Sequence, residues 1–338
     1  MNAPQVKRAV DAQRRKLRIK TALKLLFSIA AISYVLLARR ADLGDIFHTI
    51  GQASLPLIFV GLGLHVIGIF LSVIRWRYLL QAQGTDLPLW LLVKYLLVSF
   101  FFNVFLPTNI GGDIMRIVDT SRHARESVKP TAVILVERAS GLLTLLGFMA
   151  VVLILGLDVN FPVQEKLPAI WLGVVYFIGI IGLIAFLSSA RVARIMFAVF
   201  SLPLLNKAHK LLRRFYDAVM TYKQQPGLLA KALSTGLLLQ LNYVIYYIVV
   251  ARALGISSEQ APIAFFFLLI PIRDVLLLLP VAINGIGIRE NFDATVFAWI
   301  SLGSSHALAF SWLSWALGVF YALIGGIVYV ARREEAAK

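Results

Sequence analysis

The sequence predicts an all-α polytopic membrane protein with about six full spans, two re-entrant helical hairpins in an inverted repeat, and both termini in the cytoplasm. Composition is one reason: 59% of the 338 residues are hydrophobic, 15% are charged, and the mean hydropathy is +0.82. The apolar runs have helical length, unlike the short alternating strands of a membrane β-barrel. A motif also interrupts two of these runs, as LPTNIGGDIMR at 106–116 and LPVAINGIGIR at 279–289.

The apolar segments divide into full spans and broken ones. In chain order they are about 22–38, 55–74, 91–106, 131–156, 168–188, 228–251, 262–280, 284–302 and 306–331. A full span needs roughly 20 residues, whereas a run of roughly 10–14 is more often re-entrant. The predicted re-entrant elements are the third segment and the pair formed by the seventh and eighth.

The first predicted hairpin covers 95–120. Its apolar run begins after Lys94, stops at Pro107 and resumes after Gly111 and Gly112. Proline ends the incoming helix because it lacks an N–H group and clashes with the preceding turn. We therefore expect a helix that enters the membrane and leaves on the same side.

The second predicted hairpin covers 262–302. Pro271 interrupts its first arm, and Gly285 and Gly287 precede the return arm. These arms are also long enough to cross the membrane fully. Two full crossings would leave the orientation of the last span unchanged, so the predicted topology holds in either case.

Basic residues predict the orientation. With the N-terminus inside, 25 of the 33 Lys and Arg lie in cytoplasmic segments, four in outer loops and four at membrane depth. This asymmetry is the usual orientation signal of membrane proteins. It also explains the net charge of +16 without nucleic-acid binding, since cytoplasmic Lys and Arg contact anionic headgroups.

The predicted organisation is one transmembrane domain, 21–332, between a basic cytoplasmic tail at 1–20 and a short tail at 333–338. Repeat 1, about 21–156, and repeat 2, about 168–331, have opposite orientations. Inverted repeats with broken helices are common in secondary transporters.

A cytoplasmic segment, 190–226, is predicted to be amphipathic. Its Arg and Lys residues alternate with large apolar residues, which is typical of a helix in the headgroup layer. A structural role, a gating role and contact with a partner protein remain open for it.

The sequence argues against several function classes. It contains no cysteine, so thiolate metal sites, disulfides and cysteine nucleophiles are excluded. It has no hydrolase, zinc-protease, P-loop or dinucleotide-binding motif. We expect no catalytic residue, no metal and no cofactor.

Four acid–base clusters lie at membrane depth. They are Asp113 with Arg116, Glu137 with Arg138, Arg273 with Asp274, and Arg289 with Glu290. An unpaired charge at the bilayer centre costs at least ~3 kcal/mol, so such residues pair, face a cavity or act on a substrate. Pairing is one role for these acids, and carrying a proton in a coupled cycle is another.

Arg116 and Arg289 are the predicted substrate-binding residues, because a guanidinium group holds phosphate or carboxylate through two parallel hydrogen bonds. The helices that follow the glycines would direct backbone N–H groups at the same anion. The alternative is that the two arginines pin the hairpins to the bundle. The neighbouring residues predicted to contact the ligand are Asn109, Gly111, Gly112, Asn284, Gly285 and Gly287.

Three further polar residues share one face of a predicted helix in the stretch LQLNYVIYY. They are Gln240, Tyr243 and Tyr247. Residues three and four positions apart lie on the same side of a helix. We expect them to line a cavity or to pack against neighbouring helices.

Three motifs, NVFLPTNIGGDIMR, VERASGLL and LPVAINGIGIRE, resemble the signatures of the flippase-like family. That family includes the membrane half of bacterial lysylphosphatidylglycerol synthases, and the resemblance covers about 20–332. It implies a helical bundle with re-entrant elements that moves lipids between leaflets. The lysyltransferase activity of the two-part synthases is not carried over, because no synthetase domain follows the last span.

The expected function is therefore transport of a polar-headgroup lipid across a bacterial inner membrane. The alternatives are a membrane-embedded headgroup transferase, and a non-catalytic subunit that recruits a cytosolic synthase. Membrane lipids are the expected partners, with a separate lipid-modifying enzyme as a further one.

Overall fold

The computed structural model describes residues 22–38, 41–106, 111–124, 128–156, 189–200, 224–277 and 282–337, with scattered positions between 174 and 222. The described residues form helices and no strand, which confirms the all-α class. Pro107, Asn109 and Pro280 lie outside the described residues, as do most of the predicted span 168–188 and positions 201–212 of segment 190–226.

Four of the helices are long and apolar enough to cross a membrane. They are α3 (Leu55–Ala82), α6 (Val128–Ile154), α10 (Pro226–Ala253) and α13 (Ser304–Ala337). Each contains an apolar stretch with a mean hydropathy between 1.5 and 2.6. Proline occupies the first turn of α3 and of α10, where its missing N–H group would have no partner in the helix.

The remaining described helices are shorter. They are Ala22–Leu37, α2 (Leu43–Gly51), α4 (Leu89–Phe105), α5 (Gly111–Ala124), α8 (Ala190–Phe200), α11 (Ile263–Leu277) and α12 (Ile288–Trp299). A helix rises about 1.5 Å per residue, so α4, α11 and α12 are too short to cross a bilayer core of roughly 30 Å alone.

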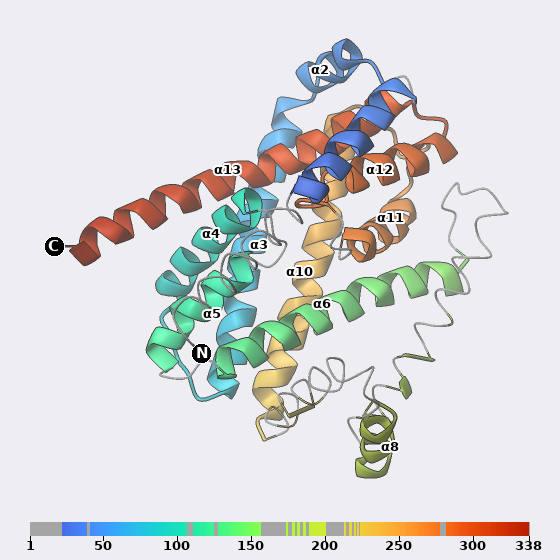
Figure 1. The fold of residues 1–338 in the computed structure, drawn as a ribbon. Coiled ribbons are helices and arrows are strands. Elements are labelled where there is room, and N and C mark those ends of the chain that lie inside the picture. The colour runs from blue at the N-terminus through green and yellow to red at the C-terminus, as the bar shows by residue number, and fades with distance from the viewer. Residues whose placement is uncertain are drawn as a thin grey trace, which may run out of the picture.

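The helices α3 and α10 pack along each other in the centre of the molecule (Figure 1). On one side of this pair, α4 packs against α5 and α13; on the other, α11 packs against α12 and α6. A core of Phe, Leu, Ile and Val fills the spaces between the second-half helices, with Phe265, Phe297 and Phe310 fully buried.

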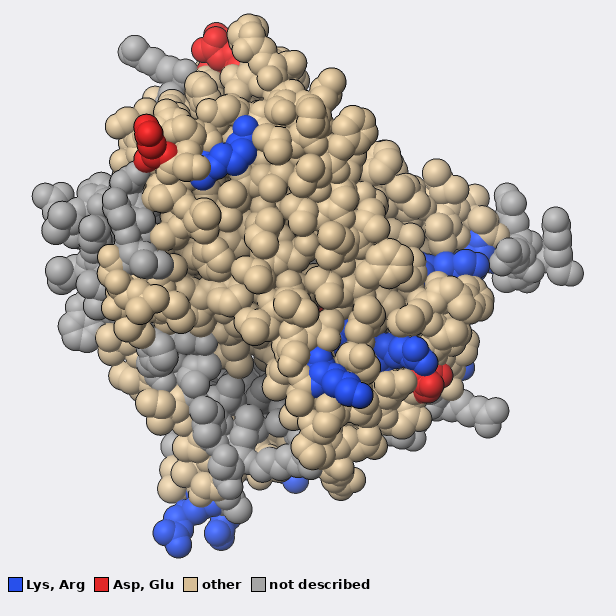
Figure 2. All heavy atoms as spheres, turned by 180° about the vertical axis from the view of Figure 1, so that it is seen from behind, with Lys and Arg blue, Asp and Glu red and all other residues tan. Residues whose placement is uncertain are grey.

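The outer surface is suited to lipid. Large apolar side chains such as Phe59, Phe70 and Ile327 are more than half exposed. The face drawn in Figure 2 carries few charged side chains across its middle. Because exposed apolar surface of this extent is not stable in water, it supports a multi-pass membrane protein.

Close packing joins the two arms of the first hairpin. The N–H group of Gly112 donates to Asn103 Oδ1 at 2.8 Å, which fixes the start of α5 against α4. A Cβ atom at Gly112 would overlap the carbonyl oxygen of Ser99. The glycine therefore allows α5 to fold back directly onto α4.

A left-handed turn precedes the return arm of the second hairpin. Asn284, Gly285 and Gly287 have φ values of +51°, +71° and +88°. Only glycine, and less readily asparagine, adopts this region without strain. The helix Ala22–Leu37 covers the turn, since Ser28 Oγ accepts a hydrogen bond from the N–H group of Ile283 at 3.3 Å.

Candidate functional site

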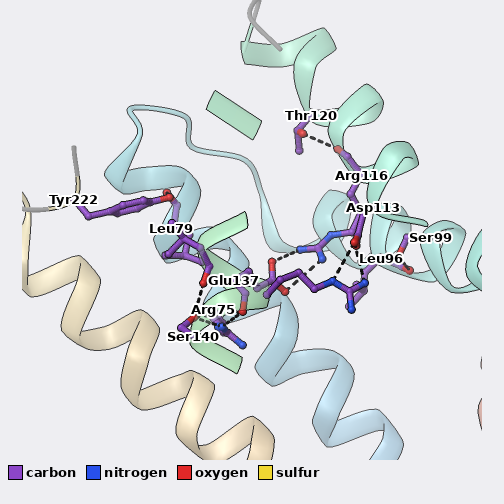
Figure 3. A network of polar contacts seen from close by, with 12 residues as sticks. Arg75, Leu79, Leu96, Ser99, Asp113, Arg116, Thr120, Glu137, Ser140 and Tyr222 are labelled. Atoms are coloured by element: carbon purple, nitrogen blue, oxygen red, sulfur yellow. Dashed lines mark hydrogen bonds and ion pairs between the residues drawn. The ribbon is translucent and has the colours of Figure 1, made fainter. Parts of the chain in front are cut away.

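An arginine–glutamate pair links the first hairpin to α6. Arg116 of α5 donates from Nη2 to Glu137 Oε2 at 2.6 Å and from Nη1 to Glu137 Oε1 at 3.3 Å (Figure 3). The Arg116 guanidinium also stacks on the ring of Trp76 from α3, with 4.0 Å between them. Both charged side chains are nearly enclosed, with 7% and 11% of their surface exposed.

A second pair joins the same two helices at the surface. Arg138 of α6 donates from Nε and from Nη2 to Asp113 Oδ2, at 3.0 and 2.9 Å. The Arg138 side chain is 56% exposed, whereas Asp113 is buried. Each acid therefore bonds to the arginine of the other helix, and the sequence neighbours Glu137 and Arg138 point to different partners.

A third arginine, Arg75 of α3, completes this cluster. It is buried and donates from Nη2 to the carbonyl oxygen of Glu137 at 2.5 Å and to Ser140 Oγ at 2.6 Å. Its side chain lies beside Gly141 of α6 and Gly236 of α10, which leave the space that it fills. Arg75 is one of the 25 basic residues counted above as cytoplasmic, although it directly follows the apolar run 55–74. The structure places it in the helix α3 instead.

In the second half, Arg289 lies in the first turn of α12. Its Nη2 donates to Glu290 Oε1 at 2.6 Å, and its Nε donates to Ser311 Oγ of α13 at 2.9 Å. Glu290 Oε2 accepts the N–H group of Gly287 at 2.6 Å. An acidic side chain is favourable at this position because the N-terminus of a helix carries partial positive charge.

Arg273 of α11 has a partner that the sequence did not indicate. Its Nη1 lies 3.3 Å from Asp293 Oδ2 of α12, and both side chains are almost fully enclosed. The guanidinium group also stacks on Tyr247 of α10 at 4.2 Å. Asp293 became recognisable as a site residue only once α11 and α12 were seen to pack together.

The predicted α10 residues lie close to this second cluster. Tyr243 donates from its hydroxyl group to Asp274 Oδ1 at 3.3 Å, and Tyr247 donates to the Tyr243 hydroxyl group at 3.2 Å. Gln240 lies one turn earlier, against Gly141 of α6. All three side chains thus face α6 and α11 between the two ion clusters.

A hydrogen bond joins the end of α4 to the turn before α12. Asn284 donates from Nδ2 to the carbonyl oxygen of Val104 at 2.6 Å, and Val104 lies one residue before the end of α4. The predicted glycines approach protein atoms here: Gly111 lies against Leu106, and Gly285 against Leu277.

Two hollows lie outside the ion clusters. A largely apolar groove of about 550 Å³ separates the helix Ala22–Leu37 from α12, with Phe27, Tyr34, Asn291 and Phe292 among its lining residues. A more polar hollow of about 760 Å³ lies where α2, α10 and α13 meet. No group of three His, Asp or Glu side chains suited to a metal occurs in the described part of the chain.

The chain matches one known family of membrane proteins. Residues 21–326 match the family model described as the lysylphosphatidylglycerol synthase TM region. No curated protein matched the chain. The match covers both hairpins and both ion clusters and includes no synthetase domain. The chain therefore belongs to the family of the transmembrane region of lysylphosphatidylglycerol synthases.

Proposed function

We propose that this chain is a flippase that moves a lipid with a phosphate-bearing or otherwise anionic headgroup between the leaflets of a bacterial inner membrane. The placement of Arg116 and Arg289 carries the proposal. Each lies near the start of a hairpin's return arm, is buried among apolar helices and is held by a carboxylate. Arginine keeps its charge at membrane depth and matches the geometry of a phosphate group.

Helix packing supports an inverted repeat as the framework of this function. Exchange of α3–α6 with α10–α13 in chain order maps the contact between α3 and α10 onto itself, and it converts the other main contacts among these eight helices into ones that are also present. For example, α4 packs on α13 as α11 packs on α6, and α5 packs on α6 as α12 packs on α13. The contact between the end of α4 and the turn before α12 lies between the halves, where many transporters bind their substrates.

In the proposed cycle, the headgroup binds at the arginine of one hairpin and passes to the arginine of the other. The acyl chains stay in the bilayer during this transfer. The apolar groove between the helix Ala22–Leu37 and α12 offers them a path beside the second hairpin. Asp113, Glu137 and Glu290 hold arginines between substrates. Asp274, which accepts a hydrogen bond from Tyr243, is the acid that carries a proton in a coupled cycle.

Transport fits these contacts better than headgroup transfer does. Glu137 and Asp113 are the carboxylates that a transferase would use as a base, and both accept hydrogen bonds from arginines. A general base must be able to receive a proton from its substrate. We therefore propose a non-enzymatic role, with any lipid-modifying step performed by a separate enzyme.

Leaflet exchange in proteoliposomes tests the proposal. Fluorescent phosphatidylglycerol, phosphatidylcholine and polyprenyl-phosphate analogues are followed in wild type, Arg116→Ala and Arg289→Ala, each checked for folding. We expect wild-type exchange to fall about tenfold or more in both variants, since a charge-assisted hydrogen bond contributes about 1.5–3 kcal/mol. Arg77→Ala, which removes a partly exposed arginine paired with Asp86, is the matched control.

Exchange no faster than in empty liposomes, for every lipid and with or without an ion gradient, would refute the flippase proposal. Equal loss in Arg77→Ala would show that the variants act through folding or reconstitution instead of the site.

A further inference from the structure

The first-half ion cluster carries one more positive charge than its own acids neutralise. Its members are Arg75, Arg116, Arg138, Asp113 and Glu137. Within the described residues, Arg75 makes no ion pair: it donates to a backbone carbonyl group and a serine hydroxyl group. Asp274 of α11 interacts with the charge of Arg138 from outside this group, so the surplus lies at the inner arginines, Arg75 and Arg116. A buried charge without a counter-ion is costly, so these two arginines are electrostatically prepared for one more anion.

Glu137 occupies the centre of this cluster. Its carboxylate bonds to both terminal nitrogens of Arg116 and also interacts with the charges of Arg75 and Arg138. Arg116 and Arg75 approach it from different helices, as Figure 3 shows. The arrangement of one carboxylate among three guanidinium groups is the one that a phosphate group would also favour.

Arg116 can donate a further hydrogen bond beside the Glu137 carboxylate. Arg116 Nε is buried and has no hydrogen-bond partner among the described residues. A planar guanidinium group presents five N–H donors, more than the two oxygens of one carboxylate can satisfy in a fork. A phosphate group has additional oxygens for such donors.

The cluster also extends to the protein surface. Arg138 is more than half exposed, Arg116 is nearly enclosed and Arg75 is buried. Glu137 lies nine residues after the start of α6, which corresponds to a depth of about 14 Å along the helix. The three arginines thus form a series from the exposed Arg138 to the nearly enclosed Arg116 and the buried Arg75.

We propose that Glu137 is an internal counter-ion that occupies the place of the substrate's phosphate. On binding, a lipid phosphate displaces the Glu137 carboxylate and bonds to Arg116 and Arg75, which makes Arg75 a third substrate-binding arginine. This inference rests on the proposed flippase function for the identity of the ligand. The arginines keep an anionic partner in both states, so neither state leaves Arg116 uncompensated.

Binding in detergent tests the inference separately from transport. The probes are short-chain phosphatidylglycerol, short-chain phosphatidylcholine and inorganic phosphate, each titrated into wild type, Glu137→Gln, Glu137→Asp and Arg75→Gln. We expect phosphatidylglycerol to bind about tenfold more tightly to Glu137→Gln, equivalent to about 1.4 kcal/mol, and more weakly to Arg75→Gln. Glu137→Asp should lie between wild type and Glu137→Gln, because its shorter side chain reaches Arg116 less well.

The matched control is Asp86→Asn, which removes one negative charge outside the spans. Hydrogen bonds from Arg77 and Gln81 lower the pKa of the Asp86 carboxyl group, so this residue is charged at neutral pH. Binding to Asp86→Asn should equal binding to wild type. If Asp86→Asn binds phosphatidylglycerol as tightly as Glu137→Gln does, the change in net charge alone explains the effect. That result would overturn the inference.

The other outcomes separate the two proposals. Unchanged or weaker phosphatidylglycerol binding in Glu137→Gln and Glu137→Asp overturns the counter-ion role, even if wild type exchanges lipids. Tighter binding without leaflet exchange supports the anion site and refutes the flippase function. If Glu137→Gln does not fold, the phosphatidylglycerol affinities of the other proteins decide. The inference requires Glu137→Asp to bind more tightly than wild type, and Arg75→Gln to bind more weakly. Inorganic phosphate that binds as tightly as the lipid would identify a site for free phosphate and overturn the lipid assignment.

Discussion

At the residue scale, a buried ion pair joins α11 to α12. Arg273 and Asp293 are both enclosed, and their guanidinium and carboxylate groups lie 3.3 Å apart. Loss of one partner from a buried ion pair leaves the other charge uncompensated, whereas loss of both is often tolerated.

We therefore predict that Asp293→Ala lowers the free energy of unfolding by about 3–5 kcal/mol. The double variant Arg273→Met/Asp293→Leu should recover most of this loss, because two apolar side chains replace the pair. Thermal unfolding in detergent, followed by intrinsic fluorescence, measures both. If the double variant is less stable than Asp293→Ala, the uncompensated charge of Arg273 is not the cause of the instability of Asp293→Ala.

The turn before α12 gives a second prediction at this scale. Gly287 has φ +88°, and a Cβ atom there would approach the Ala31 Cβ atom to 2.6 Å. Gly287→Ala should destabilise the protein by more than 1–3 kcal/mol, roughly the cost of backbone strain alone, because overlap adds to it.

Gly84→Ala is the control for this experiment, since Gly84 has φ +78° with open space around it and tests strain without overlap. The double variant Gly287→Ala/Ala31→Gly should relieve the overlap and keep the strain. Equal stability of Gly84→Ala and Gly287→Ala would show that the helix Ala22–Leu37 does not press on the turn.

At the element scale, α5 is held on two sides. Ion pairs join it to α6, and at its other end Arg332 of α13 donates to Asp119 Oδ2 at 2.8 Å. The Asp119 side chain is almost fully enclosed, and the Arg332 guanidinium stacks on Tyr95 at 5.6 Å. The first hairpin is thus anchored to a helix of the other half.

We predict that Arg332→Gln loosens the end of α13 and the end of α5 together, because it leaves Asp119 with a weaker partner in a buried position. Hydrogen exchange of the two helix ends should accelerate in this variant. The control is Arg333→Gln, the same substitution at the adjacent residue. Faster exchange in α13 alone would mean that Asp119 does not couple the two helices.

The sequence predicted most of the elements for a physical reason. Apolar runs bounded by proline, glycine and charge set the limits of the spans, and the described helices confirm an all-α membrane protein with four long apolar helices. The number of spans, the re-entrant character of the hairpins and the inverted repeat stay predictions.

The site residues were harder to predict, because partners in an ion pair need not be neighbours in sequence. Consecutive residues on a helix point about 100° apart, so Glu137 and Arg138 face different helices. Arg75 and Asp293 were missed because their burial depends on helices far away in the chain. Asn284 was predicted to contact a ligand, which stays a prediction, and its hydrogen bond to Val104 could be found only from the structure.

At the scale of the whole molecule, orientation is the prediction that the charge distribution makes most directly. The chain has no cysteine, so single cysteines can be introduced without removing others. Ser258 and Gln224 are both exposed and lie at opposite ends of α10. A membrane-impermeant maleimide should label Ser258→Cys in intact cells and Gln224→Cys only in opened membranes; the reverse pattern would invert the topology.

The fixed position of the buried arginines also has an electrical consequence. In the proposed cycle the headgroup passes from one arginine to the next while the arginines stay in their helices, so the negative charge of the headgroup moves through the membrane field. Moving one elementary charge through 100 mV involves about 2.3 kcal/mol. Exchange of anionic phosphatidylglycerol should therefore change in rate when a voltage is imposed across the vesicle membrane, whereas exchange of zwitterionic phosphatidylcholine should not.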